Sequence, residues 1–353
     1  MDTLALLNSH PRDGAIMFDE KEHKYTVSGD ARDYMSVTTF NKELFDQFNP
    51  EKVASELVKN KNKMNDPSYK YYRMTVAEII DGWNKNGKDA SGKGTAMHLD
   101  IERFFNGVPV ENDSKEYSYF CDFWRDFGCK HNWLRSKPSL PLPESTLPLP
   151  ESSLPLPEST LQSSTQSLTP TQSLTPQQNA PIDLDTIPLV PYRTEWMVYY
   201  EEYQMSGSID MLFENPDGTL QIYDWKRCLH ISPQHDRPDY PKFGKVKCVR
   251  DLPDNHYWHY ALQLNMYKRI LEAKYGKTVV ALYLICLHPT HSEYQRIQLP
   301  MLPKHIDRIL KHRKKMISGK LTSSSPSSIS VAADKKKPPA IKPSAHPVPE
   351  CFV

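Results

Sequence analysis

Two parts of the chain alternate hydrophobic and polar residues in the way that is typical of β-strands. Residues 15–29, AIMFDEKEHKYTVSG, predict a β-hairpin. Residues 192–203, 207–214 and 219–228 predict two or three further strands, with NPDG as a tight turn between the last two. The apolar run TVVALYLICLHP, residues 278–289, has the length of one more strand.

Helical spacing appears between and around these strands. Leu262, Met266 and Ile270 recur every four residues on one face of a predicted helix, and Gly276 suits its C-terminal cap. A basic helix is predicted over residues 304–319, and the charged stretch after SVTTF is expected to be mostly helical. This order of elements predicts an α/β fold with a mixed central sheet flanked by helices.

Two segments lack any such periodicity. Residues 140–160 read LPLPEST LPLPESS LPLPEST, and the two prolines in every repeat exclude a helical coiled coil. We expect residues 136–186 to be a disordered, partly polyproline II insertion and residues 321–353 to be a disordered basic tail. The prolines of the insertion are either a spacer or a docking segment for a protein partner.

The two foldable blocks each look incomplete alone. Residues 14–135 hold the N-terminal hairpin and the helical part, and residues 187–320 hold most of the predicted strands. We therefore expect both blocks to form one domain, into which the proline-rich segment is inserted. An insertion that loops out from the surface has a modest entropic cost.

Composition narrows the class of protein. Lys plus Arg total 44 and Asp plus Glu total 43 among 353 residues, so net charge favours neither nucleic acid nor membrane as a partner. No apolar run has bilayer length, the N-terminus lacks a signal-peptide pattern, and the six cysteines form no CxxC pair. These features predict an intracellular, soluble protein of the cytoplasm or nucleus, with no membrane partner.

Charged residues inside the predicted strands indicate chemistry. Asp224 and Lys226 are two residues apart in IYDWKRC, so they share one face of a strand. Strand pairing would bring them to one end of the sheet with Asp210 of GSID and Glu195 of TEW. Carboxylates that cluster repel one another, and Mg²⁺ or Mn²⁺ removes that repulsion. A metal site is the prediction, and an ordinary ion pair between Asp224 and Lys226 is the alternative.

A predicted helix carries a histidine that could complete this site. In GKGTAMHLDIERFF, His98 and Glu102 are four residues apart on one helix face, and Gly94 and Thr95 suit a helix start. An imidazole ligand favours Mn²⁺ more than a site made only of oxygen atoms would. Glu102 suits a solvated helix face equally well.

Five short motifs occur in order: GTAMH, the glutamate of TEW, GSID, DWK and QLNMY. Together they resemble the PD-(D/E)XK nuclease superfamily, and most closely its RecB-like exonuclease branch, which includes proteins of large DNA viruses and phages. The similarity runs from about residue 16 to residue 298, interrupted by the proline-rich segment. It implies a restriction-endonuclease-like core.

The resemblance also implies a role for each matched residue. His98, Asp210, Asp224 and the Trp225 carbonyl would bind metal, and both aspartates would be catalytic. Lys226 would orient or deprotonate the attacking water and stabilise negative charge, with a pKa that the metal site lowers.

Three more residues match motifs of this branch. Glu195 would be an auxiliary catalytic acid, and Gln263 and Tyr267 of QLNMY would contact DNA. Only Cys286 and Cys351 follow that motif, so we expect no iron–sulfur cluster of the kind that some related proteins carry.

Basic residues outside these motifs offer contacts to phosphate. The loop at residues 233–258 combines lysines with aromatic residues, which suits single-stranded nucleic acid, and a solvated loop is the alternative. Its basic residues are Lys242, Lys245, Lys247 and Arg250. Those of the last predicted helix are Arg308, Lys311, Arg313, Lys314 and Lys315, where a solvated face is again the alternative.

These observations predict a metal-dependent DNA nuclease, an exonuclease that acts in recombination, repair or processing of DNA ends. Its substrate would be DNA with a free end or a single-stranded region. The alternatives are a catalytically silent DNA-binding or scaffold protein on the same fold, and an RNA nuclease.

Overall fold

The computed structural model describes residues 2–135, 184, 186–234 and 241–319. Its helices are α1 (Thr3–Leu7), α2 (Val37–Glu43), α3 (Pro50–Lys59), α4 (Lys61–Met64), α5 (Val76–Phe105), α6 (Lys115–Phe127), α7 (His256–Lys274) and α8 (Pro303–Ile317). Its strands are β1 (Ile16–Asp19), β2 (Lys24–Val27), β3 (Asp30–Ser36), β4 (Val190–Tyr200), β5 (Met205–Glu214), β6 (Leu220–Lys226), β7 (Val279–Cys286) and β8 (Gln295–Gln298). The tail at 321–353 and nearly all of the insertion at 136–186 lie outside the described residues. In the described ranges, no helix has both the length and the hydrophobicity to cross a bilayer.

The strands form one mixed sheet of eight strands. β1, β2 and β3 pair antiparallel in sequence order, and β3 then pairs in parallel with β5, so both foldable blocks contribute to the same sheet. β4 runs antiparallel along β5, and β6 pairs antiparallel with the end of β5. β7 is parallel to β6, with α7 as the crossover, and β8 closes the far edge. The α/β fold with a mixed central sheet is confirmed, as is the N-terminal hairpin.

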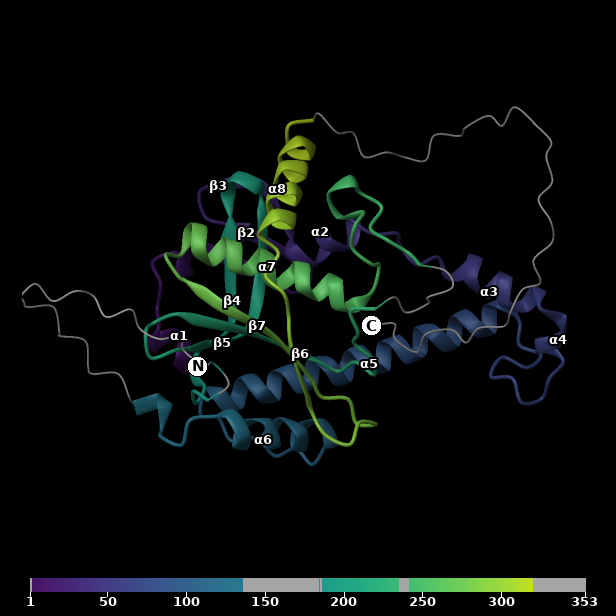
Figure 1. Cartoon of the computed structure of the whole chain (residues 1–353), viewed down its shortest axis with the longest axis horizontal. Coiled ribbons are helices and arrows are strands. Elements are labelled where there is room, and N and C mark those ends of the chain that lie inside the picture. Colours follow the sequence, from purple (N-terminus) through teal and green to yellow (C-terminus); the bar gives the residue numbers. More distant parts are fainter. Residues whose placement is uncertain (1, 136–183, 185, 235–240, 320–353) are drawn as a thin grey trace, which may run out of the picture.

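Helices cover both faces of this sheet (Figure 1). On one face α7 packs with α2 and α8, and the core there is largely aliphatic, as with Ile222, Leu282 and Leu284. On the other face α5 and α6 pack against aromatic side chains, such as Tyr223 and Trp225. Successive residues of β6 and β7 alternate between the two cores because side chains in a strand point to opposite faces in turn. Both faces are buried, which is why these strands are nearly continuous hydrophobic runs.

A buried arginine ties the N-terminal segment to β4. Arg193 is 5% exposed and donates hydrogen bonds to the Asn8 carbonyl and to Asp13 Oδ2, at 3.0 and 2.8 Å. The indole N–H of Trp196 donates to the other oxygen of Asp13 at 2.8 Å. Burial alone would raise the pKa of Asp13, but the hydrogen bonds from Arg193 and Trp196 outweigh it and lower that pKa.

Replacing Asp13 by asparagine should therefore lower the free energy of unfolding by about 2–3 kcal/mol, because the buried guanidinium loses its charged partner. Since the folded-state pKa is lowered, this stabilisation is present above about pH 4 and is lost as pH falls through the folded value. Urea unfolding at pH 7 and pH 3 measures both effects. Asp33→Asn, an exposed carboxylate on β3, is the control, and equal stability of the two variants at pH 7 would contradict the prediction.

Candidate functional site

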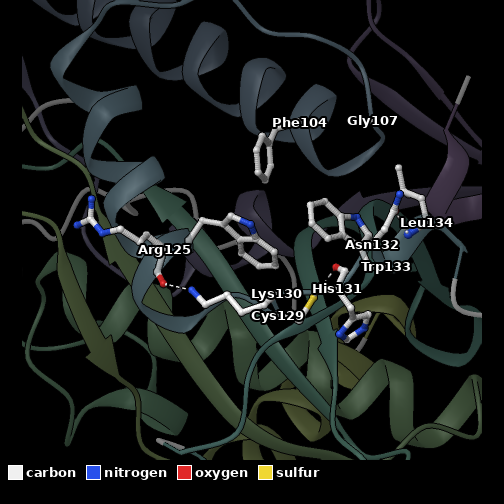
Figure 2. Close-up of a pocket in the computed structure, with 10 residues that line it drawn as sticks. Phe104, Gly107, Arg125, Cys129, Lys130, His131, Asn132, Trp133 and Leu134 are labelled. Carbon is white, nitrogen blue, oxygen red and sulfur yellow. Dashed lines mark hydrogen bonds between the residues drawn. The ribbon is translucent and has the colours of Figure 1, made fainter.

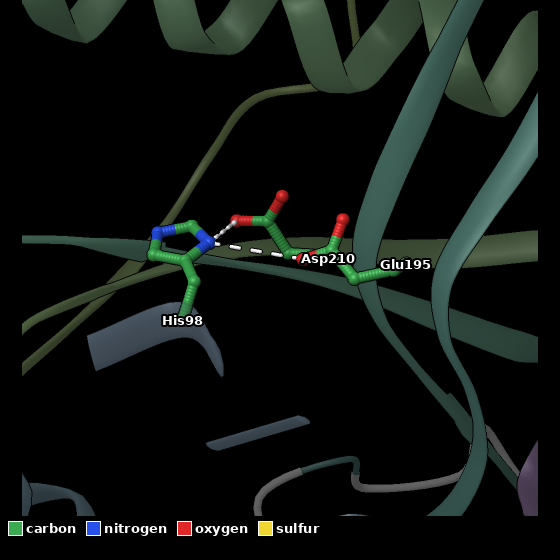
Figure 3. Close-up of side chains that lie close together, drawn as sticks. All are labelled: His98, Glu195 and Asp210. Atoms are coloured by element: carbon green, nitrogen blue, oxygen red, sulfur yellow. Dashed lines mark ion pairs between the residues drawn. The ribbon is translucent and has the colours of Figure 1, made fainter. Parts of the chain in front are cut away.

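Three side chains from distant parts of the sequence meet at one point: His98 of α5, Glu195 of β4 and Asp210 of β5 (Figure 3). His98 Nδ1 lies 3.5 Å from Asp210 Oδ2 and 3.9 Å from Glu195 Oε1. One ligand atom from each residue lies within 4.8 Å of the other two. Strand pairing and helix packing thus bring together three of the residues that the sequence singles out.

His98 is held by a helix that begins much earlier than expected. Gly94 and Thr95 do not start it: α5 begins after Thr75, whose side chain and that of Glu78 form a reciprocal capping box. The helix start predicted at GKGT was wrong. A glycine inside a helix costs about 1 kcal/mol, which weakens the helix but does not end it. The helix is anchored beyond them by Met97 and Ile101, which are buried against the sheet.

The second ring nitrogen of His98 fixes the orientation of the first. His98 Nε2 lies 2.8 Å from the carbonyl oxygen of Trp225, which can only accept, so Nε2 donates. Nδ1 then faces Asp210 and Glu195. A metal-binding histidine commonly donates its other N–H to such a partner. The Trp225 carbonyl, expected among the metal ligands, has His98 as its partner in this structure.

Glu195 has a backbone conformation that is unusual for a strand. Its φ is 41°, in the left-handed region that a residue with a Cβ rarely adopts. It lies between the pairs Thr194↔Met211 and Trp196↔Ile209, which places it opposite Asp210. Its carboxylate accepts a hydrogen bond of 2.9 Å from the Ser208 hydroxyl. Strain of this kind persists where surrounding structure enforces it and is concentrated at functional sites.

Asp210 lies where two strands separate. The β5–β6 pairs end at Met211↔Tyr223, although β6 continues beside β7 as far as Lys226. In place of a β5 backbone group, the amide of Trp225 donates to Asp210 Oδ2 at 3.1 Å. Asp224 and Lys226 thus lie at the C-terminal end of β6, as expected, whereas Asp210 and Glu195 lie in the middle of β5 and β4, where β5 and β6 diverge.

Asp224 and Lys226 form an ion pair beside these three residues. The Lys226 ammonium also lies 3.9 Å from Asp210 Oδ2. Asp224 is 2% exposed, and its other carboxylate oxygen accepts a hydrogen bond of 3.3 Å from Gln263. Asp224, expected as a ligand, is thus next to the three-residue cluster but directed at Lys226 and Gln263.

Burial makes the two aspartates of this site harder to ionise. It raises the pKa of Asp210, and together with the charge of Asp210 it raises that of Asp224 to about 6, despite the ion pair with Lys226. Burial alone would lower the pKa of His98, but Asp210 and Glu195 outweigh it and raise that pKa to about 9. A cation bound in the cluster would act against these pKa shifts, because it favours ionised carboxylates and unprotonated imidazole.

The expected lowering of the Lys226 pKa concerns a lysine beside a metal-bound water, whereas the protein groups by themselves act in the opposite direction. Burial alone would lower it, but the carboxylates of Asp224 and Asp210 outweigh burial and raise it. Its ammonium also lies 5.0 Å from the centre of the Tyr260 ring, a cation–π contact that favours the charged form. These surroundings hold Lys226 as a cation, which suits charge stabilisation and not proton abstraction.

The α7 residues expected to contact DNA are placed differently from each other. Gln263 is half-buried and reaches Asp224, whereas Tyr267 is 3% exposed and packs over Gly207. Sequence reasoning missed Tyr260. The available signal was its spacing, since positions 260, 263 and 267 follow one stripe of a helix.

The contact between Gly207 and Tyr267 links two of the sequence motifs. A Cβ at position 207 would lie 2.7 Å from the Tyr267 hydroxyl oxygen. We expect Gly207→Ala to lower the free energy of unfolding by about 1–3 kcal/mol, because the buried ring has to move. Urea unfolding measures the loss, and adding Tyr267→Leu should recover part of it. Gly218→Ala is a poor control because of its positive φ, so Gly14→Ala, which meets no neighbouring atom, serves instead.

The remaining candidates for nucleic-acid contact divide into exposed and buried groups. The four basic side chains of the loop after residue 240 are exposed. On α8, Arg313 is 7% exposed and donates to the carbonyls of Tyr203 and Gln204, so it cannot face phosphate, which corrects its assignment. The other four candidates on that helix, Arg308, Lys311, Lys314 and Lys315, are exposed. Glu102 is half-buried and lies outside the three-residue cluster.

The donor atoms fit a small divalent cation. Two ligands of an ion bound at about 2.1 Å lie roughly 3–4 Å from each other, and His98 Nδ1 is 3.5 and 3.9 Å from its two carboxylate neighbours. One nitrogen and two carboxylates suit Mn²⁺ better than Mg²⁺, which prefers oxygen. His98, Glu195 and Asp210 are therefore the residues that could hold a metal.

Comparison with known sequences assigns no family to this chain. No family model matches this chain, and no curated protein sequence matches it either.

Proposed function

We propose that this chain is a metal-dependent DNA nuclease of the PD-(D/E)XK class, with a restriction-endonuclease-like core, and that it acts as an exonuclease in recombination, repair or end processing. One observation carries the proposal: a His–Glu–Asp cluster suited to a cation adjoins a buried Asp–Lys pair at the point where β5 and β6 diverge. If the ion pair between Asp224 and Lys226 had only a structural role, it would explain neither the presence of His98 nor the strained backbone of Glu195.

Hydrolysis of a phosphodiester requires an activated water and neutralisation of the charge that develops on phosphate. When bound, Mg²⁺ or Mn²⁺ supplies Lewis-acid activation and charge neutralisation. Lys226 would contribute positive charge to the same phosphate from a fixed position. Asp224 positions Lys226 through their ion pair, and Gln263 in turn holds Asp224.

The test is degradation of end-labelled linear single- and double-stranded DNA in the presence of Mn²⁺ or Mg²⁺. A closed circular DNA and an RNA of the same sequence run alongside. Asp210→Ala and Lys226→Ala are the variants, and Asp113→Ala, an exposed loop carboxylate, is the matched control. Loss from DNA ends that needs metal, is absent in both variants and persists in the control is the expected result.

Other outcomes select the alternatives. Cleavage of the circle would indicate an endonuclease, and preference for RNA would indicate a ribonuclease on the same site. If DNA binds equally to the native protein and both variants without any cleavage, the chain is a silent DNA-binding or scaffold protein, and the proposal is overturned.

A further inference from the structure

A pocket of about 580 Å³ lies between α5, α6 and the short helical turn Trp133–Arg135 (Figure 2). Three half-buried aromatic rings form its wall: Phe104, Trp124 and Trp133. The two indole centres are 5.1 Å apart, and Phe104 lies 6.0 and 5.8 Å from them. None of its lining residues belongs to the His98–Glu195–Asp210 cluster. The nuclease proposal therefore leaves this pocket without a role.

Basic groups border the aromatic wall. Arg125 and Lys130 line the pocket and are exposed. The Lys130 ammonium donates to the Arg125 carbonyl at 2.6 Å, which holds it at the rim, while the Arg125 guanidinium pairs with Asp122. Figure 2 shows this hydrogen bond between the Lys130 side chain and the Arg125 backbone. The rim thus offers positive charge next to flat aromatic surface.

The proline-rich segment leaves and re-enters the fold beside this pocket. Leu134, which precedes it in the chain, lines the pocket. On the return side, Leu184 packs in the same hydrophobic cluster as Trp124 and Trp133. Slightly further in, Leu189 exchanges backbone hydrogen bonds with Phe127 and Cys129, at 2.8 and 3.1 Å. Both ends of the segment are therefore tethered at the pocket.

We propose that this pocket binds the chain's own proline-rich repeats, residues 140–160, in an extended polyproline II conformation. Grooves lined by aromatic rings recognise such segments because a polyproline II helix presents preordered prolines that pack flat on the rings. Each LPLP sequence is followed by an acid, namely Glu144, Glu151 or Glu158. The repeat thus places a carboxylate next to its apolar part, as the pocket places Lys130 next to its rings.

Because the repeats belong to the same chain as the pocket, they are favoured over a separate protein as its occupant. A short flexible linker gives an effective concentration on the order of 1 mM. The first repeat starts five residues after Arg135 and the third ends at residue 160, so the later repeats have ample chain with which to turn back. Three copies at a single pocket also multiply the number of segments that compete for it.

Binding of a synthetic peptide tests the proposal. The probe is LPLPESTLPLPES, residues 140–152, measured by isothermal titration calorimetry against two proteins. One is the full chain, and the other carries a Gly/Ser sequence of equal length in place of residues 140–160. The peptide should bind the replaced protein, and a Kd of about 100 µM there predicts roughly tenfold weaker binding to the full chain, since the tethered repeats compete. Equal binding to both proteins, or to neither, would overturn the proposal.

A charge exchange locates the site. Lys130→Glu in the replaced protein should weaken the peptide about two- to fivefold, and a peptide with lysine in place of both glutamates should restore binding. Lys130 is exposed, so the fold should tolerate the change. No effect of Lys130→Glu would place the peptide elsewhere and overturn the assignment. Sedimentation of the full chain at rising concentration tests for dimers. A dimer that forms only when the repeats are present would mean that the repeats fill the pocket of a second copy, which would contradict the proposal.

Discussion

Replacing Lys226 by methionine is expected to lower kcat for DNA hydrolysis by about 10²–10³-fold, the range observed when one preorganised charge-stabilising group is removed. Methionine retains most of the side-chain volume in a position that is 18% exposed. The ammonium, which Asp224 and Asp210 hold in its charged form, is then missing from the transition state. Single-turnover cleavage of end-labelled DNA at saturating Mn²⁺ measures the effect.

Two further measurements separate this role from a structural one. Mn²⁺ affinity should not fall in Lys226→Met, because the lysine is not among the three cluster residues and its ammonium, 3.9 Å from Asp210 Oδ2, opposes a second cation there. Lys52→Met, an exposed lysine on α3, should leave kcat unchanged. A variant that cleaves DNA at the native rate would show that Lys226 only balances the charge of Asp224.

Mn²⁺ affinity is expected to rise with pH, and His98 should be the cause. The raised pKa of about 9 means that Nδ1 carries a proton at pH 7, and a metal ion has to displace it. One displaced proton gives an affinity that increases about tenfold per pH unit below pH 9 and levels off above it. Calorimetry in buffers of different ionisation enthalpy should register release of nearly one proton per Mn²⁺ at pH 7.5.

His98→Gln is the matched variant, since a glutamine amide can still donate to the Trp225 carbonyl that His98 contacts. Loss of a partner that only orients a ligand costs about 10–100-fold in metal affinity, so loss of the ligand itself should cost at least about 100-fold. The variant should also lose the proton release at pH 7.5. A native pH profile in His98→Gln would exclude His98 as a ligand.

The elements that the sequence predicted well are those with a strong local pattern. β4, β5, β6 and β7 are buried or alternating runs with turn residues between them, and the Asn215–Gly218 turn has Gly218 at a φ of 78°. α7 has Gly276, also at positive φ, just after its end. β3 and β8 were not separated from their surroundings, because each is half-exposed and lacks a regular alternation of buried and exposed residues. The place of β3 in the main sheet also depends on β5, which is distant in sequence.

The residue types of the site could also be predicted from local sequence. Burying a charged pair such as Asp224 and Lys226 inside an apolar strand costs free energy unless the pair has a function. The pair therefore marks a candidate site without any knowledge of the fold. Arg313 shows the limit of that reasoning: a run of basic residues does not reveal which of them folds back onto backbone carbonyls.

By itself, the sequence determined the strands and helices that have a strong local pattern and which residues carry unusual chemistry, because propensity, periodicity and the cost of a buried charge are local properties. The tertiary structure alone decided that His98 joins Glu195 and Asp210 while Asp224 turns to Lys226 and Gln263. It also decided that β5 and β6 part at the site and that Glu195 is strained. The position of His98 depends on contacts such as that with Trp225, 127 positions further along the chain, which only packing of the helices against the sheet can set.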